Sequence, residues 1–427
     1  MSRRPNLFYA QSGGMTAVIN ATAAGVMHAA REERARIGRV YAGANGILGA
    51  LREELFDLSA ESAATIGALR QTPGGAFGSS RYALGTPDSH PENYARLIDV
   101  FRAHNIRWFL YNGGGGSAGT SLHVAEAAHR AGYELGVVHL PKTVDNDMAG
   151  TDFSPGFGSV AKYTAVSVQE AALDVASMCA TSTQVFVMEV MGRHAGWIAA
   201  ASALAQADGQ PAPQIVLFPE VAFDERKFLA RVQDVVARDG YCVVVTAEGL
   251  AVHNPAVTAP PTASEHGKDR LNVHTGRAAP FLADLVSRTL GLRCHFAVSD
   301  YLQRSARHVA SALDVDMAWQ VGVQGVALAL AGEHRVMAGL VRTTRQRSLH
   351  WNIVPQPLAR VAGREVTLPK KFIRRDGFGI TPACRDYLLP LIQGEDYPDY
   401  RHGLPVAARP RLLRVPQKLP RWSAERL

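Results

Sequence analysis

The chain of 427 residues is 47% apolar and 19% charged, and its formal net charge is +7. A chain of this length and apolar content can bury a large core, and we expect two domains. It has no apolar run of the about 18 residues that a membrane helix needs, and no apolar segment typical of a signal peptide follows the charged N-terminus. The four cysteines form no CxxC pair, which argues against a zinc site. Because the positive charge forms no helical basic stripe, we expect a soluble cytoplasmic protein that binds neither membrane nor nucleic acid.

Short apolar runs alternate with longer helix-like stretches along the chain. The expected strands are Leu7–Ala10, Trp108–Tyr111, Gly136–Leu140, Val185–Val190, Ile215–Phe218, Cys242–Thr246 and His295–Val298. The expected helices are Ala17–Glu32, Pro91–His104, Ser117–Ala131, Val160–Ala176, Trp197–Ala207 and Glu225–Asp239. This alternation predicts an α/β fold with doubly wound, mainly parallel sheets. Because ligands of such sheets bind beyond the carboxyl ends of the strands, the loops there are the candidate binding site.

Two glycine-bearing loops come early in the chain. In QSGGMTAVIN, Gly13 and Gly14 follow the first strand and open a helix, so backbone N–H groups can approach an anion at the helix N-terminus. The loop TPGGAFGSSRY, residues 72–82, ends in Arg81, whose forked guanidinium suits phosphate oxygens. Taken singly, a tight turn and a surface arginine explain these loops equally well.

A third glycine loop, YNGGGGSAGT, covers residues 111–120 and repeats the pattern of strand, turn and helix. Ser117 is the expected N-cap of that helix. Three such turns in one α/β segment favour phosphate binding. The loop contains no carboxylate, so it offers no ligand for the metal ion that phosphate chemistry normally needs.

The heptapeptide PKTVDND, residues 141–147, follows another apolar run and contains Lys142, Asp145 and Asp147. A carboxylate at the mouth of a sheet can accept a hydroxyl proton, while the ammonium neutralises phosphate charge. This is the strongest signal in the chain for phosphoryl transfer. The alternative is an Asx-turn with solvated charges.

The second half of the chain adds cations and polar groups. EVMGRHAGW, residues 189–197, carries Arg193 in a glycine-flanked turn, where it can stabilise a transferring phosphoryl group. Glu248 stands at the end of a buried apolar run, and YLQR supplies Tyr301 and Arg304 for hydroxyls and a second phosphate. A proline-rich stretch at 253–269 predicts a mobile loop or lid.

These loops, in this order, resemble the phosphofructokinase family, and PKTVDND together with MGRHAGW resembles its diphosphate-dependent branch. The resemblance runs from Leu7 to Tyr397. It implies two Rossmann-like domains with the active site in the cleft between them, and a homodimer or homotetramer. One domain, at 5–160 and about 303–360, would bind the phosphoryl donor. The other, at 161–302 and about 361–395, would bind fructose 6-phosphate, and residues 396–427 would form a basic C-terminal arm.

The resemblance also assigns roles. Asp145 would be the general base for the sugar 1-hydroxyl, Lys142 marks the diphosphate users, and Arg193 would face the transferring group. The remaining sugar-phosphate positions would be Thr143, Val144, Met191, Gly192, Glu248, Tyr301, Leu302, Gln303 and Arg304. The donor positions would be Gly13, Gly14, Arg81, Gly115, Gly116, Ser117 and Lys142. The expected cofactor is Mg²⁺, for which Asp145 and Asp147 are the nearest candidate ligands.

Two positions depart from the family pattern: Gly116 stands where diphosphate users carry an aspartate, and Gly115 where a magnesium-binding aspartate is common. We expect a reversible diphosphate:fructose 6-phosphate phosphotransferase of glycolysis or gluconeogenesis, with impaired activity if the missing carboxylates limit the rate. Two alternatives stay open within the family, an ATP-dependent enzyme and a non-catalytic protein that binds sugar phosphate. A dinucleotide-binding oxidoreductase is the alternative from another class, although SGGMTAVIN does not fit GxGxxG.

Overall fold

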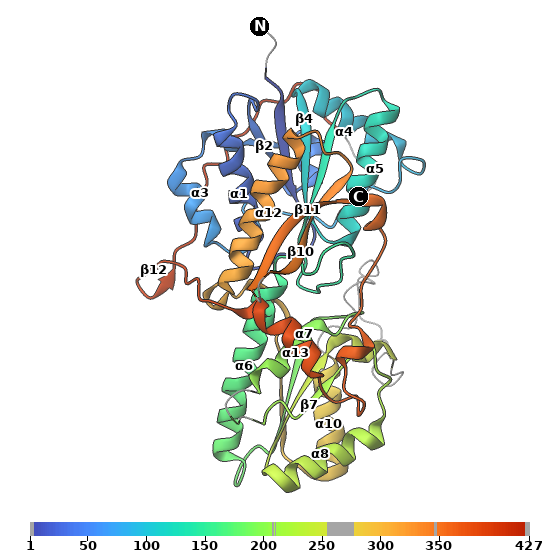
Figure 1. Cartoon of the computed structure of the whole chain (residues 1–427), viewed down its shortest axis with the longest axis vertical. Coiled ribbons are helices and arrows are strands. Elements are labelled where there is room, and N and C mark those ends of the chain that lie inside the picture. The colour runs from blue at the N-terminus through green and yellow to red at the C-terminus, as the bar shows by residue number, and fades with distance from the viewer. Residues whose placement is uncertain (1–3, 207–208, 210, 254–276, 346–347, 423–427) are drawn as a thin grey trace. The chain divides into compact units, whose positions relative to one another are not determined.

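A computed structural model describes the chain except for residues 1–3, 207–208, 210, 254–276, 346–347 and 423–427 (Figure 1). The chain divides into two compact units. Unit 1 comprises Met1–Gly156, Ala312–Glu365 and Asp396–Leu427, and unit 2 comprises Phe157–Ser311 and Val366–Glu395. Of the predicted lid at 253–269, all but His253 lies outside the described residues. Among the described residues, no helix combines the length and apolar content needed to cross a membrane.

Unit 1 is built on a seven-stranded sheet in the order β11-β10-β5-β4-β1-β2-β3. Its strands are β1 (Asn6–Gln11), β2 (Val40–Gly43), β3 (Leu55–Asp57), β4 (Ile106–Gly113), β5 (Gly136–Pro141), β10 (Val336–Arg345) and β11 (Ser348–Pro357). The central pairs are parallel, whereas β3 and β11 run antiparallel to their neighbours at the two edges. The sheet is therefore mixed, with a parallel centre whose strands are almost wholly buried.

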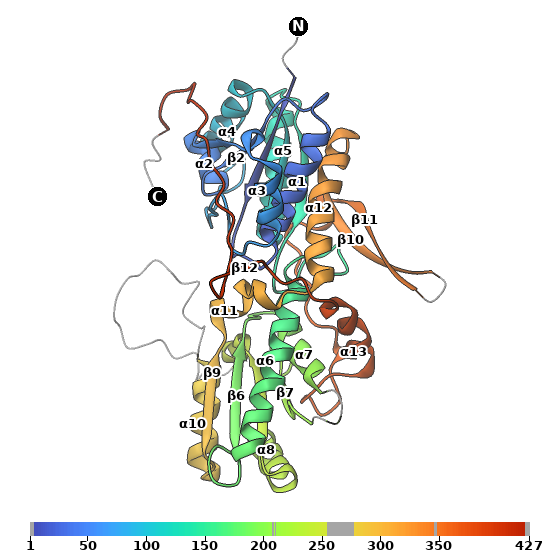
Figure 2. The same cartoon turned by 90° about the vertical axis from the view of Figure 1, so that its left-hand side faces the viewer.

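Helices cover both faces of this sheet (Figures 1 and 2). They are α1 (Ile19–Glu32), α2 (Ile47–Arg52), α3 (Ala63–Arg70), α4 (Pro91–Ala103), α5 (Gly115–Arg130) and α12 (Ala312–Leu330). Phe8, Phe109 and Tyr111 pack with apolar residues of α4 and α5 on one face. On the other face, α12 lies so close that a Cβ on Gly325 would be 2.4 Å from a methyl group of Leu140. Both faces are thus buried, as expected for a largely parallel sheet.

Unit 2 contains a four-stranded parallel sheet in the order β7-β8-β6-β9. The strands are β6 (Val185–Val190), β7 (Ile215–Leu217), β8 (Cys242–Ala247) and β9 (Cys294–Val298). The helices are α6 (Phe157–Met178), α7 (Trp197–Ser202), α8 (Glu225–Asp239), α10 (Ala278–Leu290), α11 (Asp300–Ser305) and α13 (Pro382–Leu388). Apolar residues of α8 and α10 close its core against β6, β7 and β8.

The expected elements are present at close to their expected bounds, with two differences of detail. The predicted helix Trp197–Ala207 is shorter, because α7 ends at Ser202 and a 3₁₀ turn, Ala203–Ala205, follows it. The antiparallel hairpin β10–β11, the edge strand β3 and the parallel strand β2 were not among the expected strands. The α/β class with parallel strands at its centre is confirmed.

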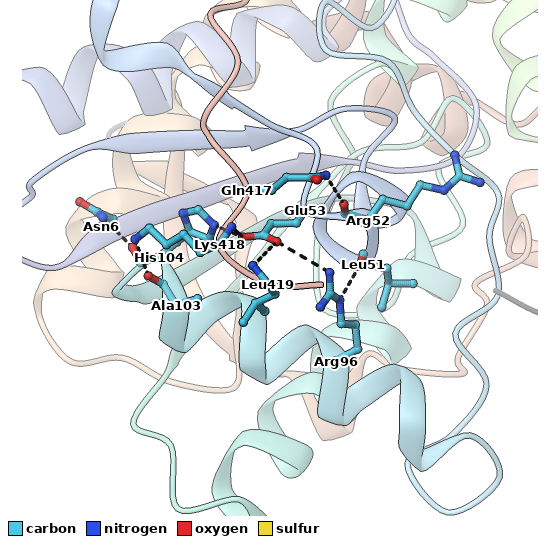
Figure 3. A network of polar contacts seen from close by, with 10 residues as sticks. All are labelled: Asn6, Leu51, Arg52, Glu53, Arg96, Ala103, His104, Gln417, Lys418 and Leu419. Atoms are coloured by element: carbon cyan, nitrogen blue, oxygen red, sulfur yellow. Dashed lines mark hydrogen bonds and ion pairs between the residues drawn. The ribbon is translucent and has the colours of Figure 1, made fainter. Parts of the chain in front are cut away.

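The C-terminal segment after Asp396 lies along unit 1, where it forms the short hairpin β12 (Tyr400–Arg401) and β13 (Leu404–Pro405) (Figure 2). Its far end is held by the buried carboxylate of Glu53 (Figure 3). Glu53 accepts hydrogen bonds from the backbone N of Lys418 at 2.6 Å, the backbone N of Leu419 at 3.0 Å and Nε2 of His104 at 2.7 Å. Burial raises the pKa of Glu53, but these hydrogen bonds together bring that pKa below its ordinary value. Glu53 is therefore a charged and well-satisfied anchor.

Candidate active site

The first glycine turn follows β1 and is held by the loop at 72–82. Gly13 has a left-handed φ of +75°, which glycine adopts without strain. Its N–H donates to the carbonyl of Ser80 at 3.1 Å, and the hydroxyl of Ser79 donates to its carbonyl at 2.9 Å. Arg81 comes directly after this contact and is exposed. The sequence-predicted donor residues Gly13, Gly14 and Arg81 are thus neighbours in unit 1.

Lys142 joins the turns that follow β1 and β4. Its backbone N donates to the carbonyl of Gly113 at 3.0 Å, and its Nζ donates to the carbonyl of Gly14 at 2.6 Å. A Cβ on Gly13 would lie only 3.6 Å from that Nζ. Lys142 is 4% exposed, so its ammonium group is buried among backbone dipoles at the carboxyl edge of the sheet. A positive charge held between two glycine turns suits a site that receives an anion.

The third glycine turn differs from the sequence prediction in one respect. Ser117 is not the N-cap of α5: the cap is Gly114, and the helix begins at Gly115. The glycine run lets the helix start two residues earlier, and Ser117 lies in its first turn, where its hydroxyl donates to Ser12 Oγ at 2.7 Å. Because its N-cap is a glycine, α5 has no side-chain hydrogen bond at its N-terminus. The first N–H groups of this 16-residue helix are therefore open to an anion.

Space is open beside the start of α5. A Cβ built on Gly115 or on Gly116 would meet no described heavy atom within 4 Å. A Cβ on Gly113, by contrast, would lie 2.4 Å from Ser117 Oγ. Glycine is thus required by packing at 113 but not at 115 or 116, where a carboxylate would fit.

Asp145 and Asp147 flank a left-handed residue, Asn146, with φ of +54°. The carbonyl oxygen of the Asn146 side chain accepts from the backbone N of Ser154 at 3.1 Å, which fixes the turn. The backbone N of Asp145 donates to Thr143 Oγ1 at 3.1 Å, and that hydroxyl lies 3.5 Å from Asp145 Oδ2. The turn therefore places two carboxylates together after β5, beside Lys142.

Asp145 and Asp147 are both partly buried, and their carboxylates repel each other. Burial, and then the charge of Asp145, raise the pKa of Asp147 from 3.8 to about 6. This disfavours the alternative of a turn with fully solvated charges. Among the described residues, no group of three or more His, Cys, Asp or Glu side chains could hold a metal ion. Within the described residues, the candidate ligands for a cation are therefore this carboxylate pair and no larger cluster.

A supporting residue that the sequence did not reveal is His139, on β5. Its Nε2 donates to the carbonyl of Gly113 at 2.9 Å, and its Nδ1 lies 3.2 Å from the hydroxyl of Ser121. Burial lowers the pKa of His139 to about 3, so the ring is neutral. His139 thus supports the third glycine turn from within the sheet. The run GVVHLP gave no signal of this role, because it is typical of a core strand.

In unit 2, three loops meet at the carboxyl edge of the sheet. The backbone N of Met191 donates to the side-chain oxygen of Gln303 at 3.2 Å, and the N of Gly249 donates to the carbonyl of Gly192 at 3.3 Å. A Cβ on Gly249 would lie 2.0 Å from the carbonyl of Arg193, so the loops after β6 and β8 are tightly packed. Glu248 begins a 3₁₀ turn, Glu248–His253, at the same edge.

The segment Tyr301–Arg304 divides into exposed and buried residues. The guanidinium of Arg304 lies 3.7 Å from the ring centre of Tyr301, which is 54% exposed. Leu302 is also exposed, whereas Gln303 is buried and supports Met191. Of the positions predicted for sugar phosphate, Tyr301 is exposed and stacks with the half-buried Arg304, and Gln303 has a supporting contact. Val144, in unit 1, is buried.

The chain is similar to known proteins over most of its length. A family model described as "Phosphofructokinase" matches residues 6–329. A protein of Halomonas elongata named pyrophosphate–fructose 6-phosphate 1-phosphotransferase is 54% identical over 419 residues, which is 98% of this chain and 99% of that protein.

Two solved structures are similar over nearly the whole chain. A pyrophosphate-dependent phosphofructokinase from Nitrosospira multiformis has a TM-score of 0.89 at 50% identity, covering 98% of this chain and 100% of that one. Its counterpart from Marinobacter aquaeolei has a TM-score of 0.87 at 50% identity, covering 97% and 98%.

Proposed function

The chain belongs to the phosphofructokinase family, and we propose that it transfers a phosphoryl group from diphosphate to the 1-hydroxyl of fructose 6-phosphate. The products would be fructose 1,6-bisphosphate and phosphate. One observation carries the choice of diphosphate: the buried ammonium of Lys142 stands between two glycine turns, and the aspartate pair follows it in the same loop. The names of the most similar relatives point to the same donor.

The chemistry follows from the residues after β5. The sugar 1-hydroxyl attacks the terminal phosphorus of diphosphate, while the bond from that phosphorus to the bridging oxygen breaks and phosphate leaves. Asp145 takes the proton of the hydroxyl as it attacks. Lys142 stabilises the negative charge on the migrating group and on the leaving phosphate, which supplies much of the acceleration in phosphoryl transfer.

The donor would lie across the turns of unit 1. The N–H groups at the start of α5 give a positive backbone surface for diphosphate oxygens. Gly13 and Gly14 belong to the same donor site, because Lys142 joins their turn to the turn after β4. Arg81, exposed beside the first turn, would bind the outer phosphate as a fork. Ser117 and Ser12 hold the two turns at a fixed distance through their hydrogen bond.

Residues of unit 2 would hold the sugar phosphate. We assign this role to Arg193, Glu248, Tyr301 and Arg304, with Met191 and Gly192 shaping the turn that carries Arg193. Arg193 would also stabilise the transferring group. Thr143 and Val144 of unit 1 would contact the sugar next to Asp145.

Mg²⁺ fits the carboxylate pair. Burial, and then repulsion by Asp145, raise the pKa of Asp147, and a divalent cation would relieve that repulsion. Mg²⁺ keeps several waters and substrate oxygens as ligands, so two carboxylates suffice for its binding with diphosphate. When bound, it would neutralise charge on the phosphates.

One observation favours a second donor, ATP: the space beside Gly115 and Gly116 is open. Formation of fructose 1,6-bisphosphate should therefore be measured with diphosphate and with ATP, each with and without Mg²⁺. We expect turnover with diphosphate and Mg²⁺, and at least about a hundredfold lower kcat/KM with ATP. A higher kcat/KM with ATP would refute the choice of donor, and sugar-phosphate binding without turnover would refute the proposed enzyme.

Gly116→Asp tests whether the absence of a carboxylate from the glycine loop limits the rate, and the structure has room for this side chain. If that carboxylate limits the rate, the variant should turn over diphosphate faster, by about tenfold or more. Gly119→Asp, one turn further along α5 and also free of steric conflict, is the matched control. An equal rate for wild type and Gly116→Asp would show that activity is not impaired by the glycine. We also propose a homodimer or homotetramer in the cytoplasm, with the mass in solution as the test of assembly.

A further inference from the structure

A cavity of about 360 Å³ lies in unit 1 at the C-terminal end of α1. Its wall is formed by the last turns of α1, the residues leading into β2, a 3₁₀ turn at Leu58–Ala60, and Ile66 of α3. Arg4, just before β1, also contributes. Arg4 and the end of α1 precede the parallel strands β1 and β2, and Leu58–Ala60 follow the antiparallel strand β3. The cavity therefore lies at the amino edge of the sheet, opposite the glycine turns, which follow parallel strands.

Positive charge dominates this cavity. Four arginines line it, namely Arg4, Arg31, Arg34 and Arg39. The carboxylates in the lining are Asp57 and Glu61. Asp57 is already engaged, because it pairs with Arg39 and accepts from the backbone N of Ser59 at 3.0 Å. Arg4 donates to the backbone carbonyl of Arg34, which leaves its charge uncompensated. The lining thus carries an excess of two positive charges.

Two buried polar atoms of the lining have no hydrogen-bond partner among the described residues. One is Nη1 of Arg31, a donor, and the other is Oε2 of Glu61, an acceptor. The other oxygen of Glu61 accepts from the backbone N of Arg411 at 2.7 Å and of Leu412 at 3.3 Å. Buried polar atoms are nearly always satisfied, so an unmatched donor and an unmatched acceptor in one cavity wall indicate a ligand that supplies the complement of each.

The wall also contains six buried apolar residues, Met27, Ala30, Ile37, Val40, Leu58 and Ile66, and the exposed residues Gly38, Ser59 and Ala60. From these features we propose that the cavity binds a small phosphate ester whose organic part has an apolar surface and one hydrogen-bond donor. The phosphate accepts from Arg31, Arg34 and Arg4, and the organic donor meets Glu61. Since the last turn of α1 exposes backbone carbonyls, the cations are also favoured there before a ligand binds.

The test is calorimetric titration of the full chain with 4-aminophenyl phosphate, which has an anion, a ring and an amino donor. We expect one bound molecule per chain at this site, and affinity at least about tenfold lower in Arg31→Met. Arg34→Ala changes an exposed residue and should weaken binding in the same direction if Arg31→Met folds poorly. Arg288→Met, which removes an exposed arginine in unit 2, is the charge-matched control and should bind like wild type.

Binding at the active site is distinguished by Lys142→Met, which should leave the affinity unchanged. Phenyl phosphate lacks the amino donor, and we expect it to bind about tenfold more weakly. The proposal is overturned if wild type binds no probe at millimolar concentration, if Arg31→Met and Arg34→Ala bind as tightly as wild type, or if Lys142→Met abolishes binding. Equal affinity for the two phosphates would overturn the role of Glu61.

Discussion

The two edges of the unit 1 sheet offer different groups for binding an anion. At the carboxyl edge, α1 and α5 begin, so backbone N–H groups and the positive ends of helix dipoles face the site, and a single buried ammonium, Lys142, completes it. At the amino edge, α1 ends, and its exposed carbonyls repel anions. Only side-chain cations can bind an anion there, which explains why arginines gather around that cavity.

Buried carboxylates near the two edges also have pKa values shifted in opposite directions. Asp147 at the carboxyl edge has a raised pKa because burial and Asp145 disfavour its charge. Glu53, beside His104, has a lowered pKa because its hydrogen bonds outweigh the effect of burial. The ionised form of Asp147 is therefore destabilised, as is common for residues of active sites, whereas the ionised form of Glu53 stabilises the fold. The following changes test this contrast.

The largest effect is expected for Asp145→Asn. Removing the proton acceptor for the sugar hydroxyl should lower kcat by about 10³ while the amide keeps the size of the side chain. Steady-state kinetics with diphosphate measures this, with Asp152→Asn, another aspartate of unit 1, as control. A kcat within threefold of wild type would remove Asp145 from the chemistry.

Lys142→Met should lower kcat/KM for diphosphate by about 10² to 10³, because a positioned charge is lost from a site with little water. Lys162→Met is the matched control, since Lys162 is also buried and pairs with Glu395 in unit 2, outside the proposed donor site. We expect Lys162→Met to lower thermal stability without an effect of that size on kcat/KM. Equal kinetic losses in both variants would indicate general destabilisation.

Asp147→Asn should stabilise the protein. The rise of its pKa from 3.8 to about 6 corresponds to roughly 3 kcal/mol against the charged form. Part of that cost remains for a buried amide, so we expect a gain of about 2 kcal/mol in the free energy of unfolding at pH 7.5 without Mg²⁺. Because the folded state binds the proton more tightly, the gain should shrink as the pH falls from about 6 to 3.8 and vanish near about pH 3, where both states are protonated. Urea unfolding at both pH values decides this.

The amino edge should lose stability in acid. Burial lowers the pKa of His104, so the unfolded state binds a proton that the folded state does not as the pH falls below the ordinary value of about 6.5. We expect the free energy of unfolding to fall by at most about 1.4 kcal/mol per pH unit from this group. His104→Gln, which can still donate to Glu53, should give a flatter profile between pH 6.5 and 5. An identical slope of the unfolding free energy against pH in wild type and His104→Gln would contradict the role given to His104.

Much of this arrangement follows from patterns in the chain. Strands such as β4 and β5 are continuous apolar runs because both faces of the sheet are covered, and the turn from Lys142 to Asp147 stands directly after one of them. The hairpin β10–β11 was missed because it contains many polar residues and leaves much of its surface exposed. Ser117 was misplaced as a cap because a glycine run allows more than one helix start.

The other omissions have a common cause. His139 looks like a core residue, and Arg31, Arg34 and Arg39 look like ordinary surface charges near the end of a helix. Their roles depend on contacts with residues distant in the chain, such as Gly113 for His139 and Asp57 for Arg39. Periodicity and local motifs carry no information about such pairs.

The most direct test of the central claim is the ratio of kcat/KM for diphosphate to kcat/KM for ATP, measured for wild type and for Lys142→Gly. If the ammonium of Lys142 selects diphosphate, wild type should favour diphosphate by at least about a hundredfold, and the variant should lose most of that preference. An unchanged ratio in Lys142→Gly, or a preference of wild type for ATP, would contradict the account.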